Sequence, residues 1–240
     1  MTGIDRVIDT AVILAGGFGT RLAAVVSDVP KPMAPIAGRP FLERLLDRLA
    51  SQGIGRAVLA VGYRSQAIRD HFGSGRAGMQ LQYSEEPEPL GTGGALRLAF
   101  ESQDLQQAIA LNGDTWCDVE LRALSRTHAA ARTAATLTLV HQTDASRFGT
   151  VEVDDRGRVA GFREKRPDAG PGLINAGVYA LDRAVFDLAP AGARFSFEND
   201  VLQARAAEGL FAAHVARNAT FIDIGVPDDY ARAQTLLAHA

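Results

Sequence analysis

Short apolar runs alternate with stretches of helical spacing along the first half of the chain. Residues 10–15 are continuously apolar, which is typical of a buried strand. Residues 40–49 place their apolar side chains at helical intervals, with Pro40 at the start and Gly53 after the end. The same criteria predict strands at residues 57–61, 79–83 and 108–111 and helices at residues 65–72 and 92–100. This alternation predicts a parallel sheet with helices on both faces.

The pattern changes near residue 117, after which short strands follow one another with few helices between them. These strands are predicted at residues 136–140, 149–153, 159–163 and 174–180, and residues 154–157 (Asp-Asp-Arg-Gly) are a candidate hairpin turn. A helix at residues 199–208, strands at 212–216 and 220–224 and a closing helix at 228–239 complete the prediction. We therefore expect one α/β domain over residues 1–240, with residues 1–116 and about 117–240 as its two halves.

Composition narrows the class of protein. The 240 residues are 47% hydrophobic and carry a formal charge of −3, with no basic cluster, so nucleic-acid binding is not expected. One cysteine, Cys117, excludes an internal disulfide and fits a reducing compartment. The first ten residues lack an apolar signal core, and no apolar run approaches the ~20 residues of a membrane span. We expect a cytoplasmic protein without a membrane partner, and a homo-oligomer is compatible with all of this.

A glycine-rich loop directly follows the first predicted strand. Gly16, Gly17 and Gly19 leave backbone N–H groups uncovered, so that a polyphosphate could approach, and Arg21 and Lys31 add two cations. No lysine followed by Ser or Thr stands behind these glycines, which excludes a P-loop. Leu22 occupies the third glycine position of a dinucleotide-binding loop, which disfavours an oxidoreductase. A glycine-rich turn without a ligand remains the alternative for this loop taken alone.

Two aspartates stand beside glycines at the ends of apolar strands. Asp114 follows residues 108–111, and Asp223 ends the last predicted strand. Either one alone is typical of a helix cap or a turn. Together with the two cations they favour a shared Mg²⁺, because this ion prefers one or two carboxylates, phosphate oxygens and water. Spacing alone does not bring the two positions together.

The second half offers polar residues in unusual places. Asn175-Ala176-Gly177 interrupts an apolar strand, which favours contact with a polar ligand such as a sugar, and Gly149 permits a similar close approach. Glu164 and Lys165 follow a predicted strand, where a solvated strand end is the simpler interpretation. The five histidines lack metal-ligand spacing, Cys117 has no evident base and is treated as structural, and no G-x-S-x-G motif is present.

With these residues assembled, the chain resembles the sugar-1-phosphate nucleotidylyltransferase family over essentially its full length. The ordered motifs that carry the resemblance are L-A-G-G-x-G-T-R-L, K-P-M, E-x-x-P-L-G-T-G-G-A, N-G-D, F-x-E-K, N-A-G and D-I-G-x-P. Residues 26–36, 112–115 and 195–198 are most similar to the short bacterial members that make GDP-heptose from D-glycero-α-D-manno-heptose 1-phosphate. Val226 departs from the family pattern, in which Thr often stands.

The resemblance implies a three-layer, Rossmann-like nucleotidyltransferase fold with a mostly parallel central sheet and a mixed sugar-side sheet. It also implies roles for individual residues. The loop residues Leu14, Ala15, Gly16, Gly17, Gly19 and Thr20 would hold the nucleotide, Arg21 and Lys31 would act on its phosphates, and Glu86, Gly91 and Thr92 would lie around base and ribose. Asp114 and Asp223 would hold Mg²⁺, Gly149, Glu164, Asn175 and Gly177 would meet the sugar, and Lys165 would meet the sugar's phosphate.

The implied reaction is Mg²⁺-dependent transfer of a nucleoside monophosphate from GTP to a sugar 1-phosphate, with the heptose phosphate as the expected acceptor. A uridylyltransferase acting on N-acetylmuramate or hexose 1-phosphate shares most of these motifs. Uracil offers an acceptor–donor edge similar to that of guanine, so the motifs leave the base open. A nucleotide-sugar-binding regulatory module without turnover is the alternative from another class.

Overall fold

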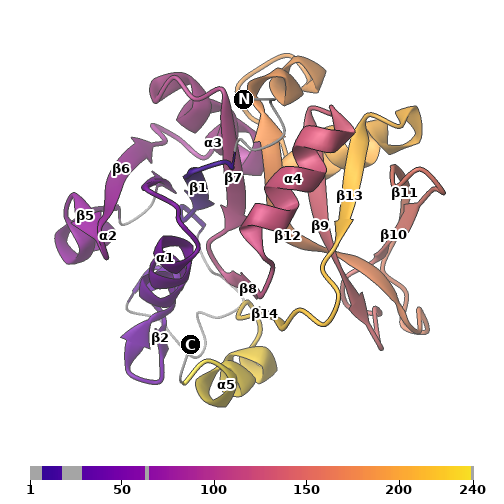
Figure 1. Ribbon diagram of the computed structural model, residues 1–240. Coiled ribbons are helices and arrows are strands. Elements are labelled where there is room, and N and C mark those ends of the chain that lie inside the picture. The colour runs from indigo at the N-terminus through magenta and orange to yellow at the C-terminus, as the bar shows by residue number, and fades with distance from the viewer. Residues whose placement is uncertain (1–6, 18–28, 63–64, 239–240) are drawn as a thin grey trace.

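One eight-stranded sheet runs through the centre of the molecule (Figure 1). The computed structural model describes residues 7–17, 29–62 and 65–238. Along the sheet the strands follow the order β13-β9-β12-β7-β1-β4-β6-β5. Their bounds are β1 Thr10–Leu14, β4 Arg56–Val61, β5 Gly75–Arg76, β6 Met79–Glu85, β7 Gln107–Asn112, β9 Ala135–Gln142, β12 Gly172–Asp182 and β13 Phe211–Val215.

The remaining elements are helices and three small strand pairs. The α-helices are α1 Phe41–Ser51, α2 Ser65–Phe72, α3 Gly91–Ser102, α4 Leu121–Ala131 and α5 Pro227–Leu236. The shorter helical turns are η1 Lys31–Met33, η2 Arg183–Leu188, η3 Phe197–Gln203 and η4 Ala206–Glu208. The pairs are β2 Pro35–Ile36 with β3 Arg39–Pro40, β8 Thr115–Cys117 with β14 Phe221–Asp223, and β10 Thr150–Val153 with β11 Val159–Arg163. In the part of the chain described, no helix has the length and apolar character that crossing a bilayer requires.

The sheet changes character along its width. Strands β7, β1, β4 and β6 run parallel, as the alternation of strands and helices predicts. Strand β12 then pairs antiparallel with both β7 and β9, and β13 runs parallel to β9. Strands from the second half of the chain therefore extend the same sheet. Because the four parallel strands end at one edge, the residues after them lie close together.

Two apolar layers cover the sheet, one on each face. Ala11 and Ile13 of β1 lie in the layer formed with α1, α2, α4 and α5, and Val12 lies in the layer formed with α3 and the turns η2 to η4. All three residues are fully buried, which explains why the sequence of β1 is apolar without alternation. The three-layer arrangement agrees with the expected fold.

Helix α4 is absent from the sequence-based expectation, and the chemistry of its buried face explains why. It buries Leu121, Leu124, Ser125 and His128, at helical spacing but with two polar members. Ser125 Oγ donates to the Leu121 carbonyl oxygen, and His128 Nδ1 lies 2.9 Å from Thr136 Oγ1 on the adjacent strand β9. An apolar periodicity search misses a helix whose core face is completed by hydrogen bonds.

Candidate functional site

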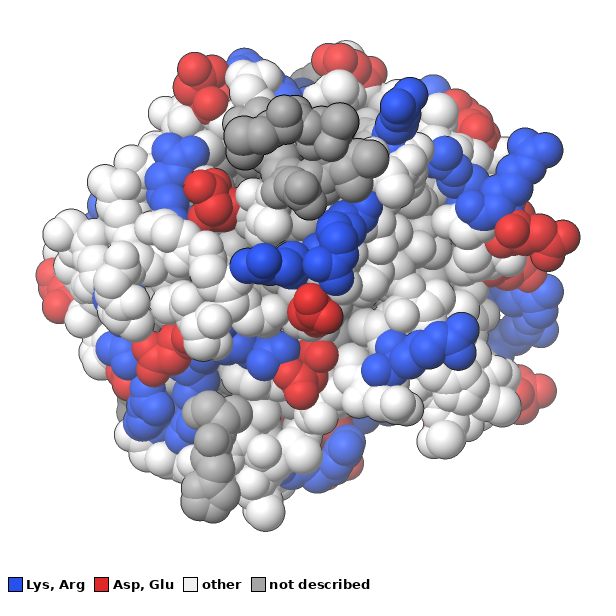
Figure 2. All heavy atoms as spheres, viewed as in Figure 1, with Lys and Arg blue, Asp and Glu red and all other residues white. Residues whose placement is uncertain are grey.

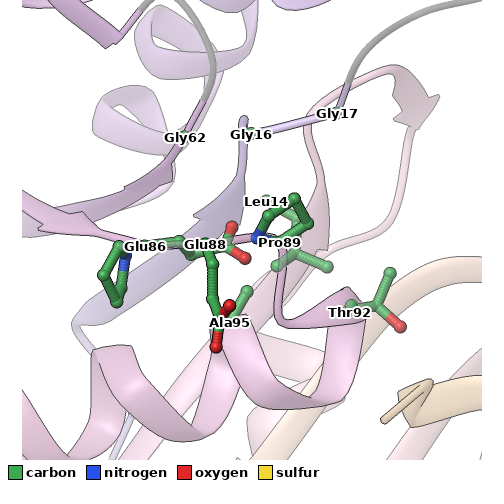
Figure 3. Close-up of a pocket in the computed structure, with 11 residues that line it drawn as sticks. Leu14, Gly16, Gly17, Gly62, Glu86, Glu88, Pro89, Thr92 and Ala95 are labelled. Carbon is green, nitrogen blue, oxygen red and sulfur yellow. The ribbon is translucent and has the colours of Figure 1, made fainter. Parts of the chain in front are cut away.

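A cavity of about 410 Å³ opens at the carboxyl edge of the parallel strands (Figure 3). It is bounded by the residues that follow β1, β4 and β6 and by the first turn of α3. Its lining residues are Leu14, Gly16, Gly17, Gly62, Glu86, Pro87, Glu88, Pro89, Gly91, Thr92 and Ala95. Six residues assigned to the nucleotide by resemblance therefore share one cavity. Gly62, Pro87, Glu88, Pro89 and Ala95 were not among them, although Gly62 follows a predicted strand in the same way as Gly16.

The other loop residues lie elsewhere. Ala15 is buried, and its backbone N–H donates to the Ala60 carbonyl oxygen at 2.8 Å, so it packs in the core beneath the cavity. Gly19, Thr20 and Arg21 lie outside the described residues. Their assignment to the nucleotide phosphates stays a prediction.

Gly16 is the point where two strand ends meet. A Cβ at this position would lie 2.9 Å from Glu86 Oε1 and 3.1 Å from the Gly62 backbone nitrogen. Any larger residue would therefore push the carboxylate out of the cavity wall. Gly17, in contrast, has nothing within 4 Å of its Cβ position, so its backbone faces open space.

The Glu86 side chain lies half-buried in the cavity wall. Burial raises the pKa of this carboxyl above its ordinary value, although the Leu90 backbone N–H donates to Oε2 at 2.8 Å and opposes the shift. Figure 3 shows the carboxylate between the Gly16 rim and the residues before α3. The site thus presents a partly desolvated carboxylate acceptor whose pKa is raised by burial.

The glycines of the Gly-Thr-Gly-Gly motif serve packing against residues 193–197. A Cβ at Gly91, which has a φ of +72°, would lie 2.6 Å from the Phe195 carbonyl oxygen. Cβ atoms at Gly93 and Gly94 would collide with the Phe195 ring and the Ala193 carbonyl oxygen. The Gly93 and Gly94 N–H groups donate to the Phe195 carbonyl oxygen at 3.0 and 3.4 Å. The protein itself therefore satisfies these N–H groups at the start of α3.

This packing carries a stability prediction. We expect Gly93→Ala to lower the free energy of unfolding by about 1–3 kcal/mol through overpacking. The Phe195 ring cannot easily yield, because its backbone is hydrogen-bonded to α3 and the Arg97 guanidinium lies 4.9 Å from its centroid. Urea denaturation measures the change, and Gly55→Ala, with nothing within 4 Å of its Cβ position, is the control. Equal stability of the two variants would contradict the packing role.

Thr92 borders the cavity, but its hydroxyl is used within the protein. It donates to Glu198 Oε2 at 2.6 Å and accepts from the Phe197 backbone N–H at 2.9 Å. Figure 3 shows this hydroxyl turned away from Glu86. Since a hydroxyl has one hydrogen, Thr92 has no donor left for a base. Glu86 is therefore the better candidate for reading the base edge.

A second group of functional side chains lies beside the cavity. The Lys31 ammonium forms an ion pair with Asp114 Oδ2 and lies 3.9 Å from Asp223 Oδ1. Strand pairing brings these positions together: β8 and β14 are antiparallel, with Asp223 opposite Thr115, and the Ile224 N–H donates to the Asp114 carbonyl oxygen. The structure thus joins three residues that are up to 192 positions apart in the sequence.

Close backbone approach connects this group to the cavity. The Gly113 N–H donates to the Leu14 carbonyl oxygen at 2.9 Å, and a Cβ on Gly113 would collide with that oxygen. A Cβ on Gly225 would lie 2.6 Å from Lys31 Nζ and 2.7 Å from Asp223 Oδ1. The two glycines therefore keep the Lys31–Asp114–Asp223 group compact and adjacent to the cavity wall.

The Asn175-Ala176-Gly177 segment forms an irregularity within β12. Its pairing with β9 shifts between Asn175 and Tyr179, and Gly177 has a φ of +66°. Asn175 Nδ2 donates to the Tyr179 hydroxyl at 2.8 Å, while its Oδ1 accepts from the Gly177 N–H at 3.1 Å. A Cβ on Gly177 would lie 2.5 Å from Asn112 Nδ2, two residues before Asp114. The segment therefore adjoins the ion-pair group.

The other residues assigned to the sugar lie near β10 and β11. Gly149 is buried and has a φ of +70°. A Cβ there would lie 2.6 Å from the Arg163 carbonyl oxygen and 3.5 Å from the Lys165 backbone nitrogen. Glu164 and Lys165 are exposed at the end of β11. The structure packs Gly149 under this strand end, and it describes no contact between Glu164 or Lys165 and Asn175.

Burial raises the pKa of the Cys117 thiol to about 12, so this cysteine is no nucleophile at neutral pH. Among the described residues, no group of three or more His, Cys, Asp or Glu side chains is placed to hold a metal ion. Tyr179 was missed as a site residue, although it stands four positions after Asn175.

Charged side chains of both signs are interspersed over the face shown in Figure 2. One group of blue side chains lies near the centre of this view, with red side chains directly beside it, and the other charges are scattered. This distribution gives no electrostatic footprint for nucleic acid on the visible face.

Comparison with known proteins places these features in context. A family model described as nucleotidyl transferase matches residues 10–240. D-glycero-alpha-D-manno-heptose 1-phosphate guanylyltransferase from Aneurinibacillus thermoaerophilus is 42% identical over 95% of this chain and 98% of its own length. The Campylobacter jejuni protein of the same name is 41% identical over 92% of this chain and 96% of its length.

Two solved structures are similar to this chain over 96% of its length. HddC from Yersinia pseudotuberculosis complexed with GMP-PN superimposes with a TM-score of 0.83 at 35% identity, covering 96% of this chain and all of that one. A putative glucose-1-phosphate thymidylyltransferase from Bacillus anthracis, at 20% identity, has the same TM-score and supports the fold alone.

Proposed function

The chain belongs to the nucleotidyl transferase family, and from that premise we propose that it transfers a guanylyl group from GTP to D-glycero-α-D-manno-heptose 1-phosphate, releasing pyrophosphate. The observation that carries this proposal is the Lys31–Asp114–Asp223 group next to the glycine-lined cavity. A cation and two carboxylates beside a nucleotide-sized cavity suit chemistry at a phosphate. The relatives at 41–42% identity support the choice of substrates.

Glu86 supports guanine as the base. The Watson–Crick edge of guanine carries two adjacent donors, N1–H and N2–H, which match the two acceptors of a carboxylate. Uracil has a single donor between two carbonyl oxygens, which a carboxylate would repel. A partly buried carboxylate discriminates strongly between the two, because an unmatched polar group loses its hydrogen bond. Gly16, Gly17 and Gly91 would let base and ribose approach this wall.

Asp114 and Asp223 fit a magnesium ion. Both carboxylates reach the Lys31 ammonium, so one cation already lies between them, and Mg²⁺ prefers such a pair completed by phosphate oxygens and water. When bound, the ion would neutralise charge on the triphosphate and the departing pyrophosphate. Arg21 would assist at the same phosphates.

The mechanism that follows requires orientation and charge neutralisation. The acceptor phosphate is itself a charged oxygen nucleophile, so no general base is needed. Lys31 would hold the acceptor and the α-phosphate of GTP near in-line geometry and offset the negative charge that develops there. The acceptor oxygen bonds to the α-phosphorus as the bond to pyrophosphate breaks. The inert Cys117 thiol is consistent with a reaction without a covalent enzyme intermediate.

Asn175 and Gly177 would form the sugar wall nearest the reacting phosphates. After its two contacts inside the protein, Asn175 retains one N–H and one lone pair for sugar hydroxyls. Gly149 and Glu164 would meet the sugar from the side of β11, and Lys165 its phosphate.

Pyrophosphate release tests the proposal. Purified protein is mixed with Mg²⁺ and each pairing of GTP, UTP, CTP, ATP and dTTP with heptose, mannose, glucose and N-acetylmuramate 1-phosphates. We expect the highest kcat/KM for GTP with the heptose phosphate. Comparable efficiency for UTP with a hexose or N-acetylmuramate phosphate would favour a uridylyltransferase, whereas nucleotide binding without turnover in every pairing would favour a regulatory module.

Lys165 provides a separate prediction. Lys165→Ala should raise the KM for the sugar phosphate about tenfold, with little change in the KM for GTP, because a hydrogen bond to a charged group is worth about 1.5–3 kcal/mol. Arg166→Ala removes the neighbouring exposed cation and is the matched control. An unchanged sugar-phosphate KM in Lys165→Ala would exclude the proposed phosphate contact.

A further inference from the structure

Glu198, on the turn η3, lies between two walls of the site. Its Oε2 accepts from the Thr92 hydroxyl of α3 at 2.6 Å, and its Oε1 lies 3.5 Å from the Tyr179 hydroxyl of β12. Thr92 borders the glycine-lined cavity proposed to hold the nucleotide. The Tyr179 hydroxyl accepts a hydrogen bond from Asn175 in the irregular segment of β12. One carboxylate thus contacts both the element beside the nucleotide and the strand proposed to meet the sugar.

The hydrogen bonds have a single consistent direction. On one arm the Phe197 N–H donates to the Thr92 hydroxyl, which donates to Glu198. On the other arm Asn175 Nδ2 donates to the Tyr179 hydroxyl, which donates to Glu198. Since an ionised carboxylate only accepts, both hydroxyl hydrogens are directed toward Glu198. The orientation of Asn175 is therefore fixed through Tyr179.

Local structure makes Glu198 a rigid centre. Phe195 and Phe197, on either side of Ser196, are buried in the apolar layer beneath α3. Ser196 caps η3, with its Oγ accepting from the Asn199 N–H at 3.1 Å and its own N–H donating to Asp200 at 2.7 Å. Tyr179 is itself buried, and burial, followed by the charge of Glu198, raises the pKa of this phenol well above 10, which keeps it a donor.

We propose that Glu198 is a positioning residue. It orients Asn175 through Tyr179, and it orients the first turn of α3 through Thr92. In this way it aligns the sugar wall, formed by Asn175 and Gly177, with the nucleotide wall, formed by the first turn of α3. The inference rests on the proposed function in that it takes the walls as the nucleotide and sugar sites. Glu198 itself is expected to act through these neighbours. The half-buried ends of the network, Asn175 and the cavity wall at Thr92, would contact the substrates.

Three conservative variants separate the two arms. Tyr179→Phe removes the Asn175 arm, Thr92→Val removes the α3 arm, and Glu198→Gln weakens both. Separate dissociation constants for GTP without Mg²⁺ and for the sugar 1-phosphate are measured by calorimetry. We expect Tyr179→Phe to weaken sugar-phosphate binding about tenfold and Thr92→Val to weaken GTP binding by a similar factor, the scale of one hydrogen bond to a charged group. Glu198→Gln should weaken both.

Matched controls are available outside the network. Tyr83→Phe removes a hydroxyl that donates to the Gly73 carbonyl oxygen, and Glu101→Gln changes an exposed carboxylate on α3. Both should bind like the wild type. A merely structural role for Glu198 would lower thermal stability and weaken both ligands equally in all three network variants. That result, or network variants indistinguishable from the controls, would overturn the proposal.

The two proposals fail in different ways. Calorimetry needs no turnover, so it tests the alignment even if no pairing of substrates releases pyrophosphate. A wild-type protein that binds both ligands without reacting would count against the proposed function, while the split between Tyr179→Phe and Thr92→Val still decides the role of Glu198. In an active enzyme, the same variants should raise KM for one substrate each more than they lower kcat.

Discussion

Asp114→Asn is expected to reduce kcat at least ~100-fold, the scale lost with one charge contact in a transition state. The substitution keeps the shape of the side chain but removes the charge that pairs with Lys31 and would bind Mg²⁺. The cost falls on turnover because charge develops at the phosphates during displacement. The measurement is pyrophosphate release over a series of Mg²⁺ concentrations.

A neighbouring aspartate is a suitable control for this variant. Asp114 directly precedes strand β8, and Asp118 directly follows it. Asp118 forms an ion pair with Arg48 outside the cavity. Asp118→Asn should keep its turnover within about twofold, since exposed ion pairs contribute about 0–1 kcal/mol. Near-normal turnover of Asp114→Asn at limiting Mg²⁺, with an unchanged melting temperature, would rule out Asp114 as a metal ligand.

The central strands could be predicted from the sequence because strands buried on both faces consist of consecutive apolar residues. Strands β1 and β7 are apolar at successive positions, and the helices between strands give the parallel order. The predicted hairpin is also present: β10 and β11 are antiparallel, and the Gly157 N–H donates to the Asp154 carbonyl oxygen. Local chemistry was sufficient for these elements.

Other elements depend on distant contacts. The helix expected over residues 199–208 is divided into η3 and η4, and η3 begins earlier, where Ser196 caps it and Phe197 enters the core. Helix α4 was missed because Ser125 and His128 complete its buried face. In both cases tertiary packing outweighs the local pattern.

The same distinction applies to the site. Sequence patterns indicated Asp114 and Asp223 separately, but only the pairing of β8 with β14 brings their side chains to Lys31. The resemblance placed Gly91 and Thr92 of the second glycine motif around base and ribose, and both line the cavity. The next two glycines, Gly93 and Gly94, are needed instead for the approach of residues 193–195. The contact between Glu198 and Thr92 joins positions 106 residues apart, which a single sequence does not reveal.

Glu86→Gln is expected to change the base preference, lowering kcat/KM for GTP about 10- to 100-fold, since one unmatched buried donor costs about 1–3 kcal/mol. The amide keeps one acceptor but places a donor against a donor of guanine. For UTP the same amide offers a donor and an acceptor, which match the O4 and N3–H of uracil. We therefore expect kcat/KM for UTP to be unchanged or raised, so that the GTP-to-UTP ratio falls further than the GTP value alone.

The pH dependence provides a second, independent measure of Glu86. Burial raises the pKa of this carboxyl, so on acidification it gains a proton at a higher pH than an ordinary glutamate and loses acceptor capacity. In the wild type, the KM for GTP should rise as the pH falls and the Glu86 carboxyl becomes protonated. In Glu86→Gln, the KM for GTP should not change over the same pH values. Glu88→Gln alters an exposed carboxylate of the same cavity and should retain the wild-type profile and base preference. If Glu86→Gln kept the wild-type GTP-to-UTP ratio, the base would be recognised by other groups, and guanine selection would have to come from the backbone around Gly91.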